Sequence, residues 1–314
     1  MSDASDSVPA YQAIRMGVPD TPAGQLADAE AWLARGPYPE VVAVTEPSFL
    51  VAREREQGGW EVLPHFGLTG AREARAALAI RLRMLAQQAA RSGDPAAATE
   101  CARVAAGVVL ESAGEARAAG ARLRVVRAGL FIRTGPSGPE PPRGSDPGPA
   151  GPDAAGDQDA GDQDPGADPT AGFVIDPAIV TGMSAGILKV DLLSLGPRPG
   201  DPPPAREDAR RAAQAYPGGV LLPAAFMLAR QSRAGGWGPG WPRTWPCPQA
   251  ARDFLASHFR LGPAAPRVPP PGTRDAQAGD LLIAGRSYRV VRVERLVRMG
   301  PDGPEGPRRC DQPG

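Results

Sequence analysis

The chain of 314 residues is long enough for two domains of ordinary size, each able to bury a hydrophobic core. Its 35 basic and 35 acidic residues cancel, so no overall charge draws the chain to nucleic acid or to an anionic membrane. Its 39 glycines and 38 prolines make up almost a quarter of the residues, a level at which disordered segments are common.

The sequence indicates a cytoplasmic location. Cys101, Cys247 and Cys310 are odd in number and widely spaced, which fits a reducing compartment better than a disulfide framework. The acidic start has no apolar run of the kind found in signal peptides, and the longest apolar stretch, 219–229, is too short to span a bilayer. We therefore expect a cytoplasmic protein without a membrane partner.

Alternating apolar residues over 11–18 predict a first strand. Thr21-Pro22 predicts the start of a helix, because a capping hydroxyl is followed by proline in the first turn. Leu26, Ala29 and Leu33 form the apolar face of this helix. The remaining strands of the first half are predicted at 41–44, 49–55, 60–63 and 123–133. Two helices precede the last of these strands: one is predicted from the apolar stripe Ala74, Leu78, Leu82, Leu85 and Ala89, and the other starts at the cap Asp94-Pro95 and runs to about residue 110.

The stretch 144–172 is of low complexity, rich in Gly, Pro and Asp and without a basic residue after Arg143. Such a segment cannot bury enough apolar surface to offset the entropy of ordering, so we predict a flexible acidic linker. Beyond it, strands are predicted at 187–195, 217–222, 226–230, 280–284 and 287–298. Helices are predicted over 201–215 and from about 251.

One motif occurs twice. The stretch Arg133 to Arg143 returns as Arg298 to Arg308, 165 positions later (133 to 298), and each copy follows an Arg-Val-Val-Arg strand. We therefore predict a tandem duplication: an α+β unit over 9–143, the linker over 144–172, and a second α+β unit over 173–314. Each unit should be a sandwich in which helices cover one face of a mixed or antiparallel sheet.

The duplication also tests for shared chemistry, because a catalytic set used by both units should appear in both. Neither His65 nor His258 has a histidine at the equivalent position, and no cysteine is shared. No metal-ligand spacing, no paired nucleophile and base, and no phosphate-binding loop is present. We expect no catalytic residues, no metal and no cofactor.

Both units keep arginines and a tryptophan, which are our candidate ligand-binding residues: Arg53, Arg127, Arg133, Arg230, Arg292, Arg298, Trp60 and Trp237. Guanidinium groups bind carboxylates and phosphates bidentately and stack on aromatic rings, which would suit an anionic ligand. We favour a structural interpretation, in which the tryptophans are buried in the core and the arginines form ion pairs with Glu140 and Glu305, a glutamate that both units share.

The chain resembles an uncharacterised family from high-GC actinomycetes. The resemblance is carried by Gly-Gly-Trp, Arg-Val-Val-Arg, Arg-x-Gly-Pro-x-Gly-Pro-Glu and the stretch Gly182 to Lys189, and it covers nearly the whole chain. The family has no assigned activity, so the resemblance implies no site. The PE-PGRS label given to some members is not supported, because this chain lacks glycine-triplet repeats.

Three functions remain open. We expect a non-catalytic module that binds a protein partner. The first alternative is an enzyme or sensor that binds a small anionic ligand through the shared arginines. The second is single-stranded nucleic acid binding through Trp60 and Trp237 with nearby arginines. It is the weakest of the three hypotheses, because the net charge is zero.

Overall fold

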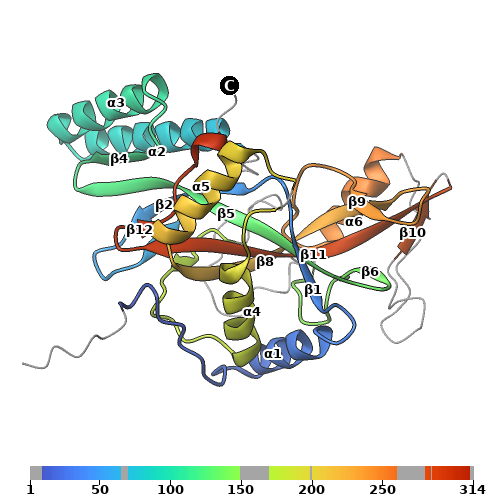
Figure 1. Ribbon diagram of the computed structural model, residues 1–314. Helices are drawn as coiled ribbons and strands as arrows, with labels where there is room; N and C mark the ends of the chain where they lie inside the picture. The colour runs from blue at the N-terminus through green and yellow to red at the C-terminus, as the bar shows by residue number, and fades with distance from the viewer. Residues whose placement is uncertain are drawn as a thin grey trace, which may run out of the picture.

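A computed structural model describes residues 9–64, 70–148, 170–198, 200–259, 280–283 and 285–311. In these residues helices pack on a curled antiparallel sheet, so the predicted α+β class is confirmed (Figure 1). Most of the predicted linker, 149–169, lies outside the described residues. None of the described helices combines the length and apolar character needed to cross a bilayer.

The helices are α1 (Pro22–Ala34), α2 (Ala71–Arg91), α3 (Pro95–Leu110), α4 (Met183–Ser194), α5 (Pro203–Ala215) and α6 (Pro248–His258). Two of the predicted caps are confirmed. The Thr21 hydroxyl accepts a hydrogen bond from Gly24 N at 3.1 Å, and the Asp94 carboxylate accepts one from Ala97 N at 2.9 Å. These bonds satisfy amide groups that the first turn of a helix leaves without a partner.

The strands are β1 (Glu40–Ala43), β2 (Ser48–Glu54), β3 (Trp60–Val62), β4 (Glu115–Ala118), β5 (Ala121–Gly135), β6 (Gly138–Pro139), β7 (Val174–Ile175), β8 (Gly218–Gln231), β9 (Trp237–Pro239), β10 (Asp280–Ile283), β11 (Arg286–Gly300) and β12 (Gly303–Pro304). The main path runs β7-β3-β2-β5-β11-β8-β9, so the two longest strands, β5 and β11, lie side by side at its centre. The sheet is therefore continuous between the two halves of the chain.

Strand pairing follows the same register in both halves. In β2 and β5 Phe49 pairs with Arg127, and in β8 and β11 Phe226 pairs with Arg292. The short outer strands also match. The first residue of β3 and of β9 is a tryptophan, and it pairs with the end of β2 and of β8, respectively. In β4 and in β10 an acidic residue pairs with an arginine of the neighbouring long strand. Positions 165 apart in β5 and β11 are thus structurally equivalent.

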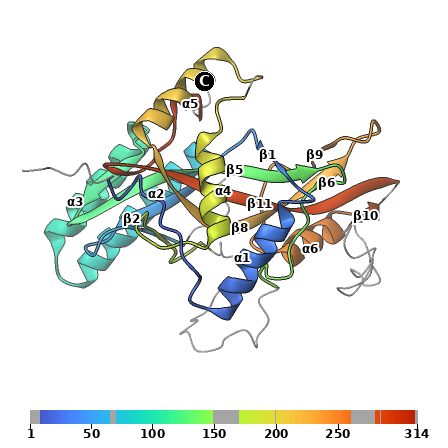
Figure 2. The same cartoon turned by 60° about the horizontal axis from the view of Figure 1, so that its bottom comes forward.

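The two faces of the sheet bury different cores. One face packs under α2 and α3 at one end and under α6 at the other, while α4 crosses its middle (Figure 2). Leu50, Ala52, Val126 and Ala128 point to the opposite face, where they meet Val220 and other residues of the second half. Because the sheet curls, this second face also buries its apolar side chains without a helix.

Two predicted strands are wrong. The apolar run 187–195 forms most of helix α4, in which Leu188 and Leu192 are buried one turn apart. A short apolar run does not distinguish a strand from a buried helix by periodicity alone, which explains the error. The segment 11–18 contains a turn and only one bridge, between Met16 and Thr181.

Helix α1 exposes the apolar face that its sequence predicts. Leu26 is 56% exposed and Leu33 is 71% exposed, Ala29 is also exposed, and no residue of α1 is buried. An apolar stripe of this kind ordinarily faces a core. We call Leu26, Ala29 and Leu33 the α1 stripe.

Candidate anion site

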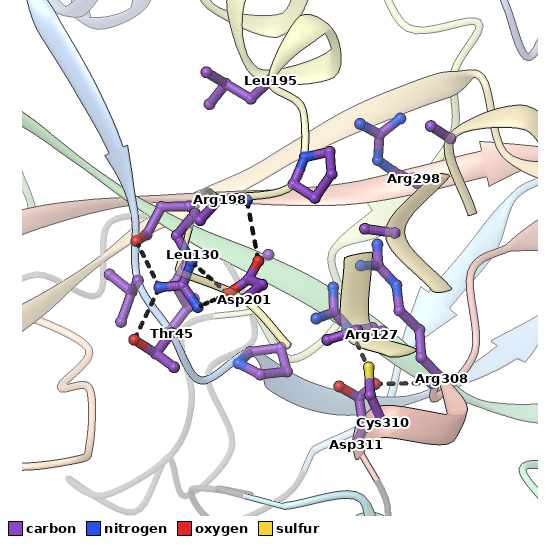
Figure 3. A pocket seen from close by; sticks show the side chains of 18 of the residues that line it. Thr45, Arg127, Leu130, Leu195, Arg198, Asp201, Arg298, Arg308, Cys310 and Asp311 are labelled. Atoms are coloured by element: carbon purple, nitrogen blue, oxygen red, sulfur yellow. Dashed lines mark hydrogen bonds and ion pairs between the residues drawn. The ribbon is translucent and has the colours of Figure 1, made fainter. Parts of the chain in front are cut away.

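A cavity of about 770 Å³ opens beside the centre of the sheet. Its walls come from the β1–β2 connection, strand β5, the segment that joins α4 to α5, helix α5 and the C-terminal residues up to Asp311 (Figure 3). It therefore lies where the two halves of the chain meet. Arg127 and Arg298, both predicted as candidate ligand-binding residues, line it together.

Three arginines gather at one end of the cavity, and we call them with their carboxylates the open cluster: Arg127, Arg298, Arg308, Glu305 and Asp311. Arg127 Nε lies 2.9 Å from Asp311 Oδ2, and Arg308 Nε lies 2.5 Å from Glu305 Oε1. The Nη atoms of Arg127 form no hydrogen bond with any described residue. Three positive groups thus share two carboxylates.

Arg298 has no carboxylate within 4 Å among the described residues. Its Nη atoms donate to Leu193 O at 2.9 Å, in the last turn of α4, and to Tyr216 O at 3.4 Å, at the end of α5. The negative ends of two helix dipoles therefore help to hold this cation. Burial lowers the pKa of the Arg298 guanidinium; Glu305 opposes the effect, and Arg308 and Arg127 add to it.

The opposite end of the cavity is electrically balanced. Arg198 Nη2 lies 2.8 Å from Asp201 Oδ1, and Arg198 Nη1 donates to the Thr45 hydroxyl at 2.8 Å. Burial disfavours the ionised Asp201 carboxylate, but hydrogen bonds from Arg198 outweigh burial and lower its pKa. The pair also ties the α4–α5 segment to the β1–β2 connection.

A related cluster lies at the equivalent positions on the other side of the sheet centre, and we call it the closed cluster: Arg133, Arg143, Arg292, Glu140, Asp146 and Glu294. Arg292 Nε lies 2.9 Å from Asp146 Oδ1, and Arg143 Nε lies 2.7 Å from Glu140 Oε1. These two pairs repeat the two pairs of the open cluster 165 positions earlier or later.

The closed cluster has a third carboxylate that the open cluster lacks. Glu294 Oε1 is in contact with Arg292 Nη1 and lies 3.4 Å from Arg143 Nη2, so it bridges two arginines. The position equivalent to Glu294 is Gly129, which lines the cavity. The open cluster therefore keeps one positive charge that its counterpart neutralises internally.

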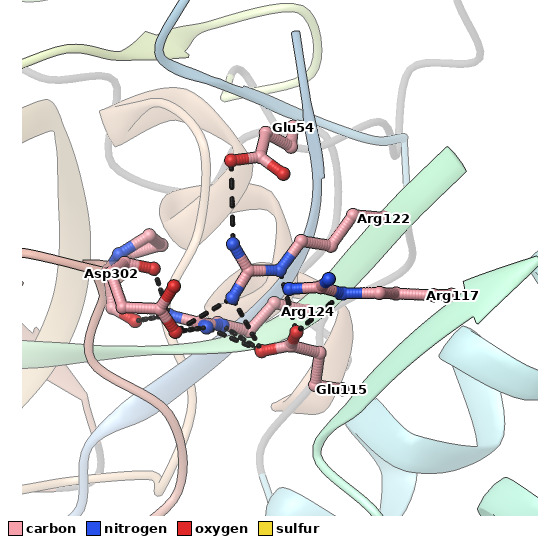
Figure 4. A network of polar contacts seen from close by, with 7 residues as sticks. Glu54, Glu115, Arg117, Arg122, Arg124 and Asp302 are labelled. Atoms are coloured by element: carbon pink, nitrogen blue, oxygen red, sulfur yellow. Dashed lines mark hydrogen bonds and ion pairs between the residues drawn. The ribbon is translucent and has the colours of Figure 1, made fainter. Parts of the chain in front are cut away.

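An arginine and a tryptophan that occur at equivalent positions in both halves form contacts between the halves. The Arg124 guanidinium of β5 lies 5.0 Å from the centre of the Trp60 ring, and Arg124 donates a hydrogen bond to Pro304 O, in β12, at 2.9 Å. Arg124 Nη2 also lies 2.8 Å from Asp302 Oδ2 and forms a second ion pair with Glu115 (Figure 4). Burial opposes ionisation of Glu115, but hydrogen bonds from Arg122 and Arg124 outweigh it and lower the pKa of that carboxyl.

The reciprocal contact exists in the second half. The Arg289 guanidinium of β11 lies 4.5 Å from the centre of the Trp237 ring, and Arg289 donates a hydrogen bond to Pro139 O, in β6, at 3.0 Å. Its Nε lies 2.6 Å from Asp280 Oδ1. Each half thus inserts an arginine and a tryptophan against the glycine–proline loop of the other, and we call these two contacts the clasps.

The eight predicted candidate residues fall into four places. Arg127 and Arg298 meet in the cavity, and Arg133 and Arg292 lie in the closed cluster. Trp60 and Trp237 belong to the clasps. Arg53 and Arg230 are exposed at the outer ends of β2 and β8, and Arg53 Nη2 lies 2.7 Å from Glu61.

Gly129 and Glu294 were not predicted, because a search for shared residues discards positions that differ. The difference itself, read at the offset of 165, was the available signal. Cys310 also lines the cavity, where burial, Asp311 and Asp208 raise the pKa of its thiol and so favour the unreactive protonated form. No group of three or more potential metal ligands is found among the described residues.

The comparisons with known proteins give a family and no activity. A family model described as "Family of unknown function (DUF5954)" matches residues 21–313. No curated protein and no solved structure matches the chain. This agrees with the resemblance to a family without an assigned activity.

Proposed function

We propose that this chain, which belongs to the DUF5954 family, binds a small anion in the cavity at the open cluster. The observation that carries the proposal is the charge balance: among the described residues, the three arginines Arg127, Arg298 and Arg308 have two carboxylates, Asp311 and Glu305, close to them. In the closed cluster, where a third carboxylate is present, two of the equivalent arginines bind it.

A partly buried guanidinium without a full set of partners is costly, because it gives up water and receives too little in return. An anion in the cavity would supply the missing acceptor. Charge-assisted hydrogen bonds from arginine are strong and suit oxyanions in a bidentate arrangement. The Nη atoms of Arg127, which form no hydrogen bond with a described residue, are available as donors to such an anion.

Thermal unfolding in the presence of acetate, sulfate or inorganic phosphate tests the proposal. An anion at one hundred times its dissociation constant should stabilise the protein by roughly 2.7 kcal/mol. Arg298→Gln should remove this stabilisation. Arg133→Gln, at the equivalent position of the closed cluster, should lower the melting temperature but leave the response to the anion intact.

Equal stabilisation of both variants by the anions would show that binding occurs elsewhere. Absence of stabilisation by every anion, at concentrations where ionic strength is held constant, would contradict the proposal.

The tandem duplication is part of the same proposal, since it explains why two clusters exist. It is supported by the common registers in the two halves and by the reciprocal clasps. Cleavage at a protease site placed between residues 149 and 169 should leave 9–143 and 173–314 associated in gel filtration. Separation of the two fragments under native conditions would contradict the interlocked arrangement.

A second candidate function is protein interaction, and the α1 stripe favours it. The stripe is apolar and exposed, and the charged groups next to it are already engaged: Arg35 lies 3.5 Å from Asp191, and Asp28 accepts from Ser184 N. A neutral apolar face suits a second copy of the chain, which would bring the same face without charge repulsion. Light scattering of the protein and of a Leu26→Gln, Leu33→Gln variant tests this: a dimer that the variant loses supports it, and a monomer at all concentrations contradicts it.

The cytoplasmic location stays a proposal supported by three free cysteines, and cell fractionation tests it. Nucleic acid binding has less support: Trp60 is 4% exposed, so its ring offers no stacking surface to a base.

A further inference from the structure

We infer that the ligand of the open cluster is a monocarboxylic acid with an apolar body, whose carboxylate takes the place that the Glu294 carboxylate occupies in the closed cluster. The inference rests on the proposed anion site and goes beyond it by naming the chemical class of the ligand.

The position of the carboxylate follows from the equivalence of the clusters. In the closed cluster one oxygen of Glu294 bridges Arg292 and Arg143. The equivalent arginines of the open cluster are Arg127 and Arg308, and both line the cavity. The ligand carboxylate therefore completes an arrangement that the protein already builds from its own side chains elsewhere.

The charge of the ligand follows from the two ends of the cavity. The open cluster has one positive charge in excess of its carboxylates, which one carboxylate neutralises. Arg198 at the far end is already paired with Asp201, and the exposed Arg210 and Glu46, which also line the cavity, cancel each other in charge, so no second anionic group is needed. A dicarboxylate or a phosphate dianion would bring a charge that the cavity does not balance, and burying it would cost free energy.

The body of the ligand follows from the walls and the volume. Apolar residues also line the cavity, among them Phe131, Leu192, Leu193 and Leu195. A volume of about 770 Å³ lies in the range that holds a small organic molecule and exceeds the needs of a bare ion. An alkyl or aromatic body would remove this apolar surface from water, which favours binding.

Gly129 keeps the carboxylate position free. A Cβ atom there would lie 2.9 Å from the Phe131 ring, so a side chain at 129 requires the ring to move. The residue equivalent to Phe131 is Leu296, which pairs directly with Gly129, while Glu294 pairs directly with Phe131. The pair Gly129 and Phe131 therefore replaces the pair Glu294 and Leu296, and the exchange opens the site.

The experiment transplants the closed cluster into the open one. The variant G129E/F131L supplies the missing carboxylate from the protein, and the matched control G129Q/F131L has the same shape without the charge. Binding is measured by calorimetry with hexanoate, 1-hexanol, adipate and inorganic phosphate as probes, at constant ionic strength. Unfolding of each variant without ligand is measured in parallel.

The wild-type protein should bind hexanoate at least tenfold more tightly than each other probe, because 1-hexanol lacks the charge, adipate brings a second one and phosphate lacks the apolar body. Tenfold corresponds to about 1.4 kcal/mol. G129E/F131L should lose hexanoate binding and melt at a higher temperature than G129Q/F131L. G129Q/F131L should keep weakened binding, which shows that charge and not bulk blocks the site.

The outcomes separate the two proposals. If no probe binds, the anion site itself is wrong. If phosphate or adipate binds as tightly as hexanoate, the anion site stands and the monocarboxylate is wrong. If G129E/F131L binds hexanoate as well as wild type, the equivalence between the ligand and the Glu294 carboxylate is overturned. If G129E/F131L does not fold, Leu195→Asp in the apolar wall replaces it, and undiminished hexanoate binding by that variant overturns the apolar body.

Discussion

Leu130 of β5 pairs with Arg295 of β11, and Arg295 lies at the position equivalent to Leu130, 165 residues later (130 to 295). A strand can pair with its own equivalent at one residue only when the two strands are antiparallel and related by a local twofold axis through that pair. The axis explains why contacts come in reciprocal sets, with an open cluster on one side and a closed cluster on the other.

The clasps should contribute strongly to stability. Arg289→Met should lower the free energy of unfolding by about 2–4 kcal/mol, because it leaves Pro139 O and Asp280 without their donor and removes the contact with Trp237. Urea unfolding measures the loss. Arg117→Met is the control: the Arg117 side chain is 69% exposed, and its replacement should change stability by less than about 0.5 kcal/mol.

A double-mutant cycle then isolates the ring contact. Combining Arg289→Met with Trp237→Leu should show a coupling of about 0.5–2 kcal/mol. Additive losses would mean that the guanidinium does not interact with the ring.

The loop after β11 should not tolerate a side chain at Gly303. Its φ of +106° lies in a region that L residues avoid, and a Cβ atom there would lie 2.7 Å from Trp60 Nε1. Gly303→Ala should cost about 3 kcal/mol or more, since strain and overlap add. Chemical unfolding measures the cost.

Gly120 is the matched control for this change. Its φ is +74° and no atom lies within 4 Å of the added Cβ, so Gly120→Ala should cost only the strain of about 1–2 kcal/mol. Equal costs at both positions would mean that the tryptophan does not fill the space beside Gly303.

The buried Lys189 should make stability rise with pH in the alkaline range. This side chain is 2% exposed and has no carboxylate partner among the described residues, and burial lowers its pKa. Between the lowered folded pKa and the ordinary unfolded value of 10.5, the unfolded state binds more protons, so the free energy of unfolding increases with pH across this window. Below the folded pKa the desolvation cost is present in full.

Lys189→Met should therefore stabilise the protein at neutral pH by about 1–3 kcal/mol and flatten the alkaline rise. Val190→Met, at a neighbouring residue that is 49% exposed, should change neither quantity. A destabilised Lys189→Met variant with an unchanged pH profile would show that the ammonium group has a stabilising partner.

The α1 stripe should contribute little to the stability of the single chain. Leu33→Gln should change the free energy of unfolding by less than about 0.5 kcal/mol, because Leu33 is 71% exposed. Leu82→Ala, on the buried face of α2, should cost about 2–5 kcal/mol. A loss above 1 kcal/mol for Leu33→Gln at low protein concentration would place the stripe inside a folded core.

Local patterns in the sequence determined most of the elements. The caps at Thr21 and Asp94 depend on neighbouring residues, so they can be read without the fold. The run 187–195 could not be assigned this way, because its burial comes from packing across the sheet centre. The α1 stripe has the pattern of a buried face, yet whether a face is covered depends on what the rest of the chain places over it.

The sequence by itself determined which residues the two halves share, and these included both arginines that meet in the cavity, Arg127 and Arg298. Only the tertiary structure decided which of them are neutralised. An ion pair depends on distances between residues far apart in the chain, as between Arg127 and Asp311. The same physics makes Glu294 close one cluster while Gly129 leaves the other open, because a single carboxylate changes the charge balance of groups already withdrawn from water.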